Sequence, residues 1–139
     1  MKAIFLDTSA FAKLYVAEEG SVELAELVYT AESIAVSAIV LPETLSALRR
    51  LVREGKIEES DYGLLKERLC RDIATIQVVS LADETIRRAV AVIENSSIRS
   101  LDAIHVGAAL AVDASLFVTA DSRQTEAARA AGLDVRFVA

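Results

Sequence analysis

The chain has 139 residues and a formal net charge of −6, and 53% of its residues are hydrophobic. This length predicts one domain over residues 1–139, and the apolar share excludes a disordered protein. The negative charge argues against a protein that binds nucleic acid by bulk electrostatics, although a carboxylate cluster that holds divalent metal also makes a chain acidic.

The sequence also bears on the cellular compartment. The longest apolar run, residues 34–42, is interrupted by Ser37 and is too short to span a membrane. Met1 and Lys2 lead directly into a strand pattern, so we expect no signal peptide. The single cysteine, Cys70, excludes an internal disulfide and suits a reducing compartment. We therefore expect a cytoplasmic protein with no membrane association.

Short apolar runs alternate with amphipathic segments along the chain. The runs predict strands over residues 2–6, 34–36, 76–81, 116–118 and 134–138. The segments between them predict helices over residues 9–17, 21–32, 37–54, 58–74, 83–95, 101–112 and 122–131. This alternation is typical of βαβ units, so the sequence predicts a three-layer α/β/α sandwich with a central, mainly parallel sheet of four to five strands.

Several helix ends carry their own signals. Gly20 suits the C-terminal cap of the first helix, and Ser37 and Ser100 suit the N-caps of two later helices. Pro42 fits the first turn of a helix, where a missing amide donor costs little. In the helix predicted over residues 83–95, the apolar stripe consists of Ile86, Ala89, Val90 and Ile93.

Four acids differ from the others because each is a lone charge in a segment that otherwise predicts burial: Asp7, Glu43, Asp102 and Asp121. Asp7 directly follows the apolar run Ile4–Leu6, at the end of a strand where open parallel sheets bind ligands. Burying one unpaired carboxylate costs several kcal/mol, so four such residues need a common reason.

Two explanations compete for these acids. Each acid is a candidate helix cap or first-turn residue, which the helix dipole favours by less than about 1 kcal/mol. Alternatively, all four meet at the carboxyl edge of the sheet and share a divalent ion, and carboxylates suit Mg²⁺ or Mn²⁺ better than Zn²⁺. We favour the shared site, in which Thr8 and Ser9 take over the capping role from Asp7.

The four acids lie in four short motifs: Leu6-Asp7-Thr8-Ser9, Ser37 with Pro42-Glu43, Ser100-Leu101-Asp102-Ala103-Ile104-His105, and Val118-Thr119-Ala120-Asp121. In this order and spacing, over essentially the whole length, the chain resembles the PIN-domain family. The likeness is strongest to the VapC-like toxin ribonucleases of type II (VapBC) toxin–antitoxin systems.

This resemblance implies an endoribonuclease that cleaves RNA phosphodiesters with metal-activated water. Asp7, Glu43, Asp102 and Asp121 would then be the catalytic quartet that binds Mg²⁺ or Mn²⁺. The resemblance also implies a cognate antitoxin and a homodimer. Two alternatives stay open: a PIN-fold protein-binding module with weak or no cleavage, and a stand-alone PIN ribonuclease without an antitoxin.

Hydroxyl residues stand beside these acids in the sequence. Thr119 and Ser9 are candidates to hold the ligating carboxylates in place by hydrogen bonds. Thr8 is a further candidate, although capping is its favoured use.

Three basic or titratable residues are candidates for contact with the substrate. Arg123 and Lys13 suit a contact with substrate phosphate, and each is equally suited to an ion pair with a nearby acid. His105, three residues after Asp102, suggests a general base, but a helix-face position near the site or core packing is favoured.

Overall fold

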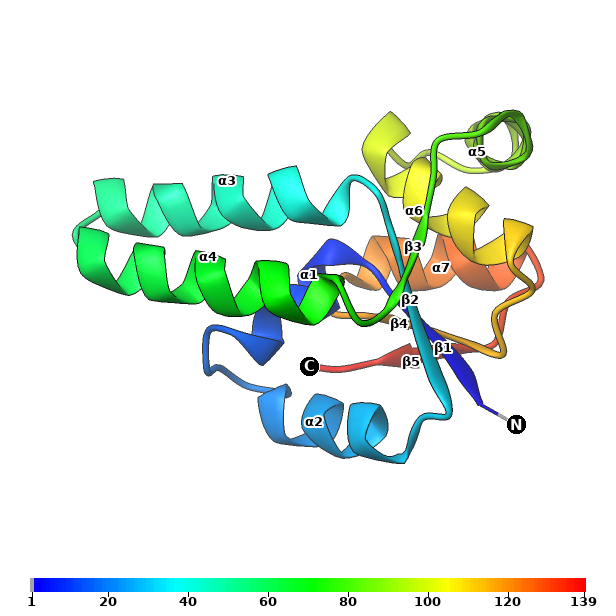
Figure 1. Cartoon of the computed structure of the whole chain (residues 1–139). Coiled ribbons are helices and arrows are strands. Elements are labelled where there is room, and N and C mark those ends of the chain that lie inside the picture. Colours follow the sequence, from blue (N-terminus) through cyan, green and yellow to red (C-terminus); the bar gives the residue numbers. More distant parts are fainter. Residues whose placement is uncertain (1) are drawn as a thin grey trace.

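The structure is a computed structural model that describes residues 2–139, and Met1 lies outside the described residues. One sheet contains five strands, all parallel, in the order β3-β2-β1-β4-β5. Their bounds are β1 Ala3–Leu6, β2 Ser33–Ser37, β3 Gln77–Val79, β4 Leu116–Thr119 and β5 Val135–Phe137. This confirms the predicted α/β class and its parallel central sheet (Figure 1).

Helices cover both faces of the sheet. They are α1 Thr8–Phe11, α2 Ser21–Thr30, α3 Val40–Arg53, α4 Glu59–Ile73, α5 Asp83–Glu94, α6 Ser100–Ala111 and α7 Ser122–Ala130, with a 3₁₀ helix, η1, at Ala12–Leu14. Helices α1 to α4 contribute to the core on one face, and α5 to α7 to the core on the other. Among residues 2–139, no helix is both long enough and apolar enough to cross a membrane.

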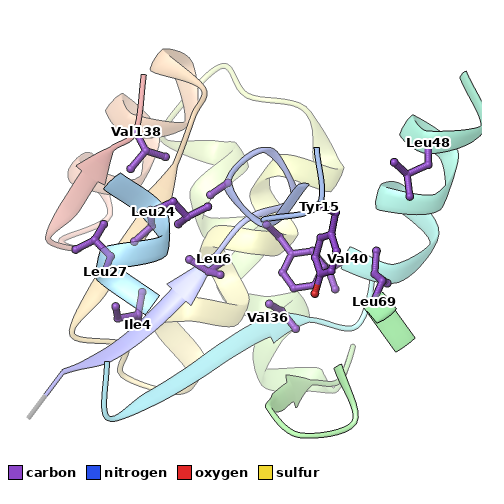
Figure 2. Close-up of a cluster of buried hydrophobic side chains, with 13 residues drawn as sticks. Ile4, Leu6, Tyr15, Leu24, Leu27, Val36, Val40, Leu48, Leu69 and Val138 are labelled. Carbon is purple, nitrogen blue, oxygen red and sulfur yellow. The ribbon is translucent and has the colours of Figure 1, made fainter. Parts of the chain in front are cut away.

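The central strand β1 is buried on both faces. Ile4 and Leu6 point into the core beneath α1 to α4, which Figure 2 shows with Val36 and Leu24 around them. Phe5 points into the opposite core and stacks on Phe117 at 5.7 Å between ring centroids. A continuous apolar run is what a strand between two covered faces requires. The rigid end of β1 therefore fixes the position of the next residue, Asp7.

Three helix ends differ from the predictions made from sequence. The first helix, predicted over residues 9–17, is one turn of α-helix at Thr8–Phe11 followed by η1, which ends at Leu14. Helix α3 begins at Val40 with Ile39 as N-cap, so Ser37 ends β2 instead of capping the helix. Ser100 is the first residue of α6, and Arg99 is its N-cap.

Gly20 begins a helix instead of ending one. It is the N-cap of α2 and has φ 90°, a backbone conformation that favours glycine. A Cβ at this position would lie 2.6 Å from the carbonyl oxygen of Val138, so the C-terminal segment also requires a glycine here.

The apolar stripe predicted for α5 is only partly buried. Ala89 is buried, but Ile86, Val90 and Ile93 have exposed fractions of 41%, 48% and 41%. The buried face of α5 instead uses small residues such as Thr85, because α6 approaches closely at Gly107. A Cβ on Gly107 would lie 2.7 Å from the amide nitrogen of Ala89 and 2.8 Å from the carbonyl oxygen of Thr85.

The space around two helical glycines differs, so substitution by alanine should have opposite effects at the two positions. Gly107→Ala should lower the free energy of unfolding by about 1–3 kcal/mol or more, because the new methyl group meets backbone atoms that cannot move independently. Gly63→Ala, inside α4 with no atom within 4 Å of the added Cβ, should raise it by about 0.5–1 kcal/mol. Urea denaturation of both variants measures the difference, and equal effects would contradict the proposed close packing of α5 on α6.

Candidate active site

The four lone acids all lie at helix N-termini. Asp7 is the N-cap of α1 and Asp121 the N-cap of α7, and each side chain accepts a hydrogen bond from a backbone amide of its helix. Glu43 and Asp102 lie in the first turns of α3 and α6. The expectation that Thr8 and Ser9 would replace Asp7 as caps is wrong, because both lie inside α1. A position at a helix N-terminus is therefore compatible with a site that the four acids share.

Asp7 is buried, and protein donors engage both of its oxygens. Its Oδ1 accepts hydrogen bonds from Ser9 Oγ at 2.7 Å and from the amide of Ala10 at 3.0 Å. Its Oδ2 accepts from Thr119 Oγ1 at 2.6 Å. Burial raises the pKa of Asp7, although the electrostatic effect of His105 and these hydrogen bonds act to lower it. The carboxylate is therefore held rigidly at the end of β1.

The same hydroxyl groups join the ends of β1 and β4. Ser9 Oγ accepts from the amide of Ala120 at 2.9 Å and lies 3.2 Å from Thr119 Oγ1. Thr119 Oγ1 in turn accepts from the amide of Asp121 at 3.1 Å. The Thr119 hydroxyl thus donates to the Asp7 carboxylate and accepts from the Asp121 amide, so that one side chain links two of the four acids.

A substitution at Thr119 should separate this role from ordinary packing. Thr119→Val keeps the shape but leaves Asp7 Oδ2 without its donor, so we expect a loss of about 1–3 kcal/mol in the free energy of unfolding. Thr44→Val is the matched control, because Thr44 is equally buried and its hydroxyl has no partner in the described chain. That variant should be neutral or stabilised in thermal melts. Equal melting temperatures for the two variants would contradict the role given to Thr119.

Glu43 is held by a second set of donors. Its Oε1 accepts from Thr8 Oγ1 at 2.6 Å and lies 2.7 Å from His105 Nε2, which is also 3.0 Å from Thr8 Oγ1. Burial acts to raise the pKa of Glu43, but the hydrogen bonds from His105 and Thr8 lower it below its usual value. Thr8 therefore contacts Glu43, the acid that follows β2.

His105 belongs to the site. It is 1% exposed, its ring meets Phe5 edge-on, and its Nδ1 has no hydrogen-bond partner among residues 2–139. A proton on Nε2 allows His105 to donate a hydrogen bond to Glu43 Oε1. The sequence favoured a helix-face position near the site or core packing for this residue, and the structure places it in the core and beside Glu43. Its position three residues after Asp102 was the available signal, since that spacing places both side chains on one face of a helix.

Asp102 and Asp121 are the more accessible pair. No hydrogen bond engages the Asp102 carboxylate in the described chain, and Asp121 Oδ1 accepts from the amide of Arg123 at 2.9 Å. Burial raises the pKa of Asp102 and the negative charge of Asp121 raises it further, whereas His105 lowers it, Glu43 raises it and Arg123 lowers it by smaller amounts. Asp102 therefore lies in a region of excess negative potential.

The chemistry of these side chains fits a hard divalent cation. They offer carboxylate oxygens, and the like charges around Asp102 favour a positive ion between them. Within residues 2–139, however, no three His, Cys, Asp or Glu side chains lie close enough together to form a ready-made metal site. Binding would therefore require side-chain rotation.

The two basic candidates have different surroundings. Lys13 has a side-chain exposure of 7%, donates to the carbonyl oxygen of Glu19 at 2.7 Å and forms an ion pair with Glu18 at 3.4 Å. Arg123 is 72% exposed and its Nε lies 3.7 Å from Asp121 Oδ1. Arg123 thus stands at the candidate site, whereas Lys13 ties η1 to the segment before α2.

Together, these features define an α/β protein with an acidic centre at the carboxyl edge of a parallel sheet. The family model of the PIN domain matches residues 4–130, so the chain belongs to the PIN domain family. This confirms the family resemblance seen in the four acidic motifs. No curated protein matches the chain in sequence.

Several solved structures share the fold. The chain is similar to VapBC2 from Rickettsia felis bound to a promoter DNA fragment, with 15% identity, a TM-score of 0.71, and coverage of 97% of this chain and 98% of that one. It is similar to VapC20 from Mycobacterium tuberculosis, a Sarcin-Ricin loop cleaving toxin (18%, TM-score 0.68, coverage 94% and 95%). It is also similar to VapBC-5 of the same organism, a member of the VapBC family of toxin-antitoxin systems (17%, TM-score 0.67, coverage 99% and 100%). At these identities the likeness shows the fold alone.

Proposed function

We propose that this protein is a Mg²⁺- or Mn²⁺-dependent endoribonuclease that cleaves RNA, and that it is the toxin of a toxin–antitoxin pair. One observation carries the proposal. The Asp102 carboxylate has no hydrogen-bonding partner in the described chain and lies in the negative potential of Asp121 and Glu43, within a PIN-domain chain. A protein without an ion to bind gains nothing from such a concentration of like charge.

The four acids would divide the work of holding the ion. Asp102, Asp121 and Glu43 each keep at least one carboxylate oxygen without a hydrogen bond in the described chain. Asp102 and Asp121 would rotate towards the free oxygen of Glu43, and the three would act as ligands. Asp7 would present its charge from a fixed position at the end of β1. When bound, the ion lowers the pKa of water and stabilises charge on the phosphate.

The surrounding groups orient these ligands. Ser9 and Thr119 fix Asp7, whereas Thr8 and His105 fix Glu43, so that each acid has a defined rotamer. Arg123 is exposed next to Asp121 and would meet a phosphate of the RNA.

The proposed partner is an antitoxin that masks the acidic centre. Two of the similar structures, VapBC2 and VapBC-5, carry the name of a toxin–antitoxin system. A chain with net charge −6 suits a partner segment rich in Lys and Arg. We expect a short open reading frame directly upstream of the gene, whose product forms a complex with this protein on co-expression and inhibits cleavage. A complex that leaves Asp102 and Asp121 accessible and active would contradict this role.

We also propose a homodimer through the exposed apolar stripe of α5, formed by Ile86, Val90 and Ile93 at helical spacing. Exposed apolar residues at this spacing are typical of a covered helix face. Sedimentation should show a dimer that Val90→Lys dissociates. Val22→Lys, at an exposed valine on α2, should leave the dimer intact. A monomer in the unmodified protein would refute the proposal.

The proposed compartment is the cytoplasm. The free Cys70 is exposed and no disulfide is formed, which suits a reducing environment that also contains the RNA substrate. Cell fractionation tests this assignment, and recovery of the protein outside the cytoplasmic fraction would contradict it.

Incubation with RNA tests the central proposal. The purified protein, mixed with transfer, ribosomal and messenger RNA in Mg²⁺ or Mn²⁺, should produce discrete internal fragments, and EDTA should stop their formation. Intact RNA of all three classes in both metals would sink the proposal and favour a binding module with the same fold.

A further inference from the structure

A surface pocket of about 310 Å³ adjoins the acidic centre, and apart from Asp102 and Arg123 its lining residues have no role in the mechanism above. It lies between the segment that joins α5 to α6 and helix α7, and Asp102 and Arg123 form its border with the centre. Its volume is at the small end of the range of ligand-binding pockets, roughly 300–1,000 Å³. Asp102 borders both the acidic centre and this pocket. If an RNA phosphate is held at the centre, the adjacent nucleotide of the RNA would lie beside the pocket.

Besides Asp102 and Arg123 at its border, the pocket is lined by two oppositely charged side chains that form no ion pair with each other. Arg99 and Glu126 both line it and both are exposed, yet neither forms an ion pair or a hydrogen bond through its side chain in the described chain. An arginine and a glutamate in one small pocket without mutual contact leave room for a polar group between them. Both charged groups are therefore free to bind a ligand.

The remaining walls supply acceptors and an apolar surface. Asn95 Nδ2 donates to the carbonyl oxygen of Ala91 at 2.7 Å, and Ser96 Oγ donates to that of Val92 at 2.8 Å. These bonds use the Ser96 hydroxyl proton and one of the two Asn95 amide protons, so the oxygens of both side chains are left as acceptors. Ala127 adds an apolar wall. A flat aromatic ring with polar edges fits such a lining.

We propose that this pocket binds one unstacked guanine base of the RNA, next to the phosphodiester that is cut. This inference rests on the proposed function. Guanine is the base that presents two adjacent acceptors, O6 and N7, which arginine binds in a bidentate manner, as Arg99 would. It also presents two adjacent donors, N1–H and N2–H₂, which match a carboxylate such as that of Glu126. Adenine, cytosine and uracil each place an acceptor where this carboxylate needs a donor.

Binding of mononucleotides tests the pocket without any cleavage. Guanosine 5′-monophosphate has no internucleotide bond, so it can be titrated into the whole protein with Mg²⁺ present and followed by NMR. We expect shifts of the amides of residues 95–99 and 126–127, and a Kd at least about fivefold lower than that of adenosine 5′-monophosphate. Shifts elsewhere, or equal affinity for the two nucleotides, would overturn the proposal.

Three variants assign the contacts. Arg99→Ala should raise the Kd for guanosine monophosphate by about fivefold or more, and Glu126→Gln should remove the preference over adenosine monophosphate. Arg71→Ala, which removes an exposed arginine on α4, is the matched control and should bind like the unmodified protein. An Arg99→Ala variant with unchanged binding would refute the role of this residue.

Cleavage of short RNAs distinguishes a substrate base from a free nucleotide ligand. In oligoribonucleotides with one guanine moved along the chain, the cut should move with the guanine. Cleavage that ignores its position overturns the inference and leaves the proposed ribonuclease intact. Guanine-selective binding in a protein that cuts no RNA would instead contradict the proposed function.

Discussion

Asp102→Asn should strongly reduce RNA cleavage and, at the same time, stabilise the metal-free protein. We expect activity to fall by about 10²- to 10³-fold, the loss seen when one group that stabilises developing charge is removed. The melting temperature should rise, because burial and the charges of Asp121 and Glu43 oppose the ionised form of Asp102. If Asp102 had a structural role instead, its replacement would lower the melting temperature and leave the cleavage activity of the folded protein unchanged.

The matched control is Asp134→Asn. Asp134 is exposed and its side chain takes no part in the acidic centre, so both cleavage and melting temperature should stay unchanged. Gel assays of RNA fragments and thermal melts in EDTA measure the two quantities. An Asp102→Asn variant that is less stable in EDTA would show that this carboxylate has a favourable partner, and would contradict the proposed metal site.

Mg²⁺ should stabilise the protein at neutral pH and lose this effect in acid. At a Mg²⁺ concentration 100 times the Kd, a single site adds about 2.7 kcal/mol to the free energy of unfolding, which corresponds to roughly 10 °C in Tm for a chain of this size. The effect fades in acid because protonated carboxylates no longer bind the ion. Calorimetry at several pH values, with Mg²⁺ or EDTA, measures it.

The pH dependence of the metal-free protein has a definite sign. The pKa values of Asp7 and Asp102 are raised in the folded state, so the folded protein holds these protons more tightly than the unfolded chain. Their contribution to stability is complete below the usual pKa of about 3.8 and is lost as the pH rises through the raised values. The advantage of Asp102→Asn over the unmodified protein should therefore grow with pH, and a constant difference would contradict this.

Mg²⁺ should have no such effect on the Asp102→Asn variant. If the ion stabilises this variant as much as the unmodified protein, the binding site lies elsewhere. A melting temperature that does not respond to Mg²⁺ or Mn²⁺ in either protein would remove the basis for metal-dependent chemistry at this centre.

The sequence by itself determined the parallel sheet and the position of its central strand. The run Ile4–Leu6 is apolar without interruption, which is typical of a strand covered on both faces. Because parallel strands end at one edge, the acids that follow β1 and β4 were predictable as neighbours. The isolation of each acid in an apolar segment marked these residues as unusual before any geometry was known.

The tertiary structure alone decided which partners each side chain meets. Lys13 resembles a candidate phosphate ligand in sequence, but the turn after η1 directs it to Glu18. The contact between His105 and Glu43 joins residues 62 positions apart, a relation that helical spacing within one segment does not encode.

The same limit applies to burial on α5 and to the function of Asp7. The periodicity of α5 indicates an apolar stripe that includes Val90. In the structure, α6 packs closely on α5 at Gly107, so that Thr85 and Ala89 are buried and Val90 is exposed. Asp7 likewise combines two roles that appeared to exclude each other in sequence. One of its oxygens caps α1, while Thr119, more than a hundred residues away, binds the other and holds it at the acidic centre. Local patterns specify local structure, and long-range packing determines which of the resulting surfaces meet.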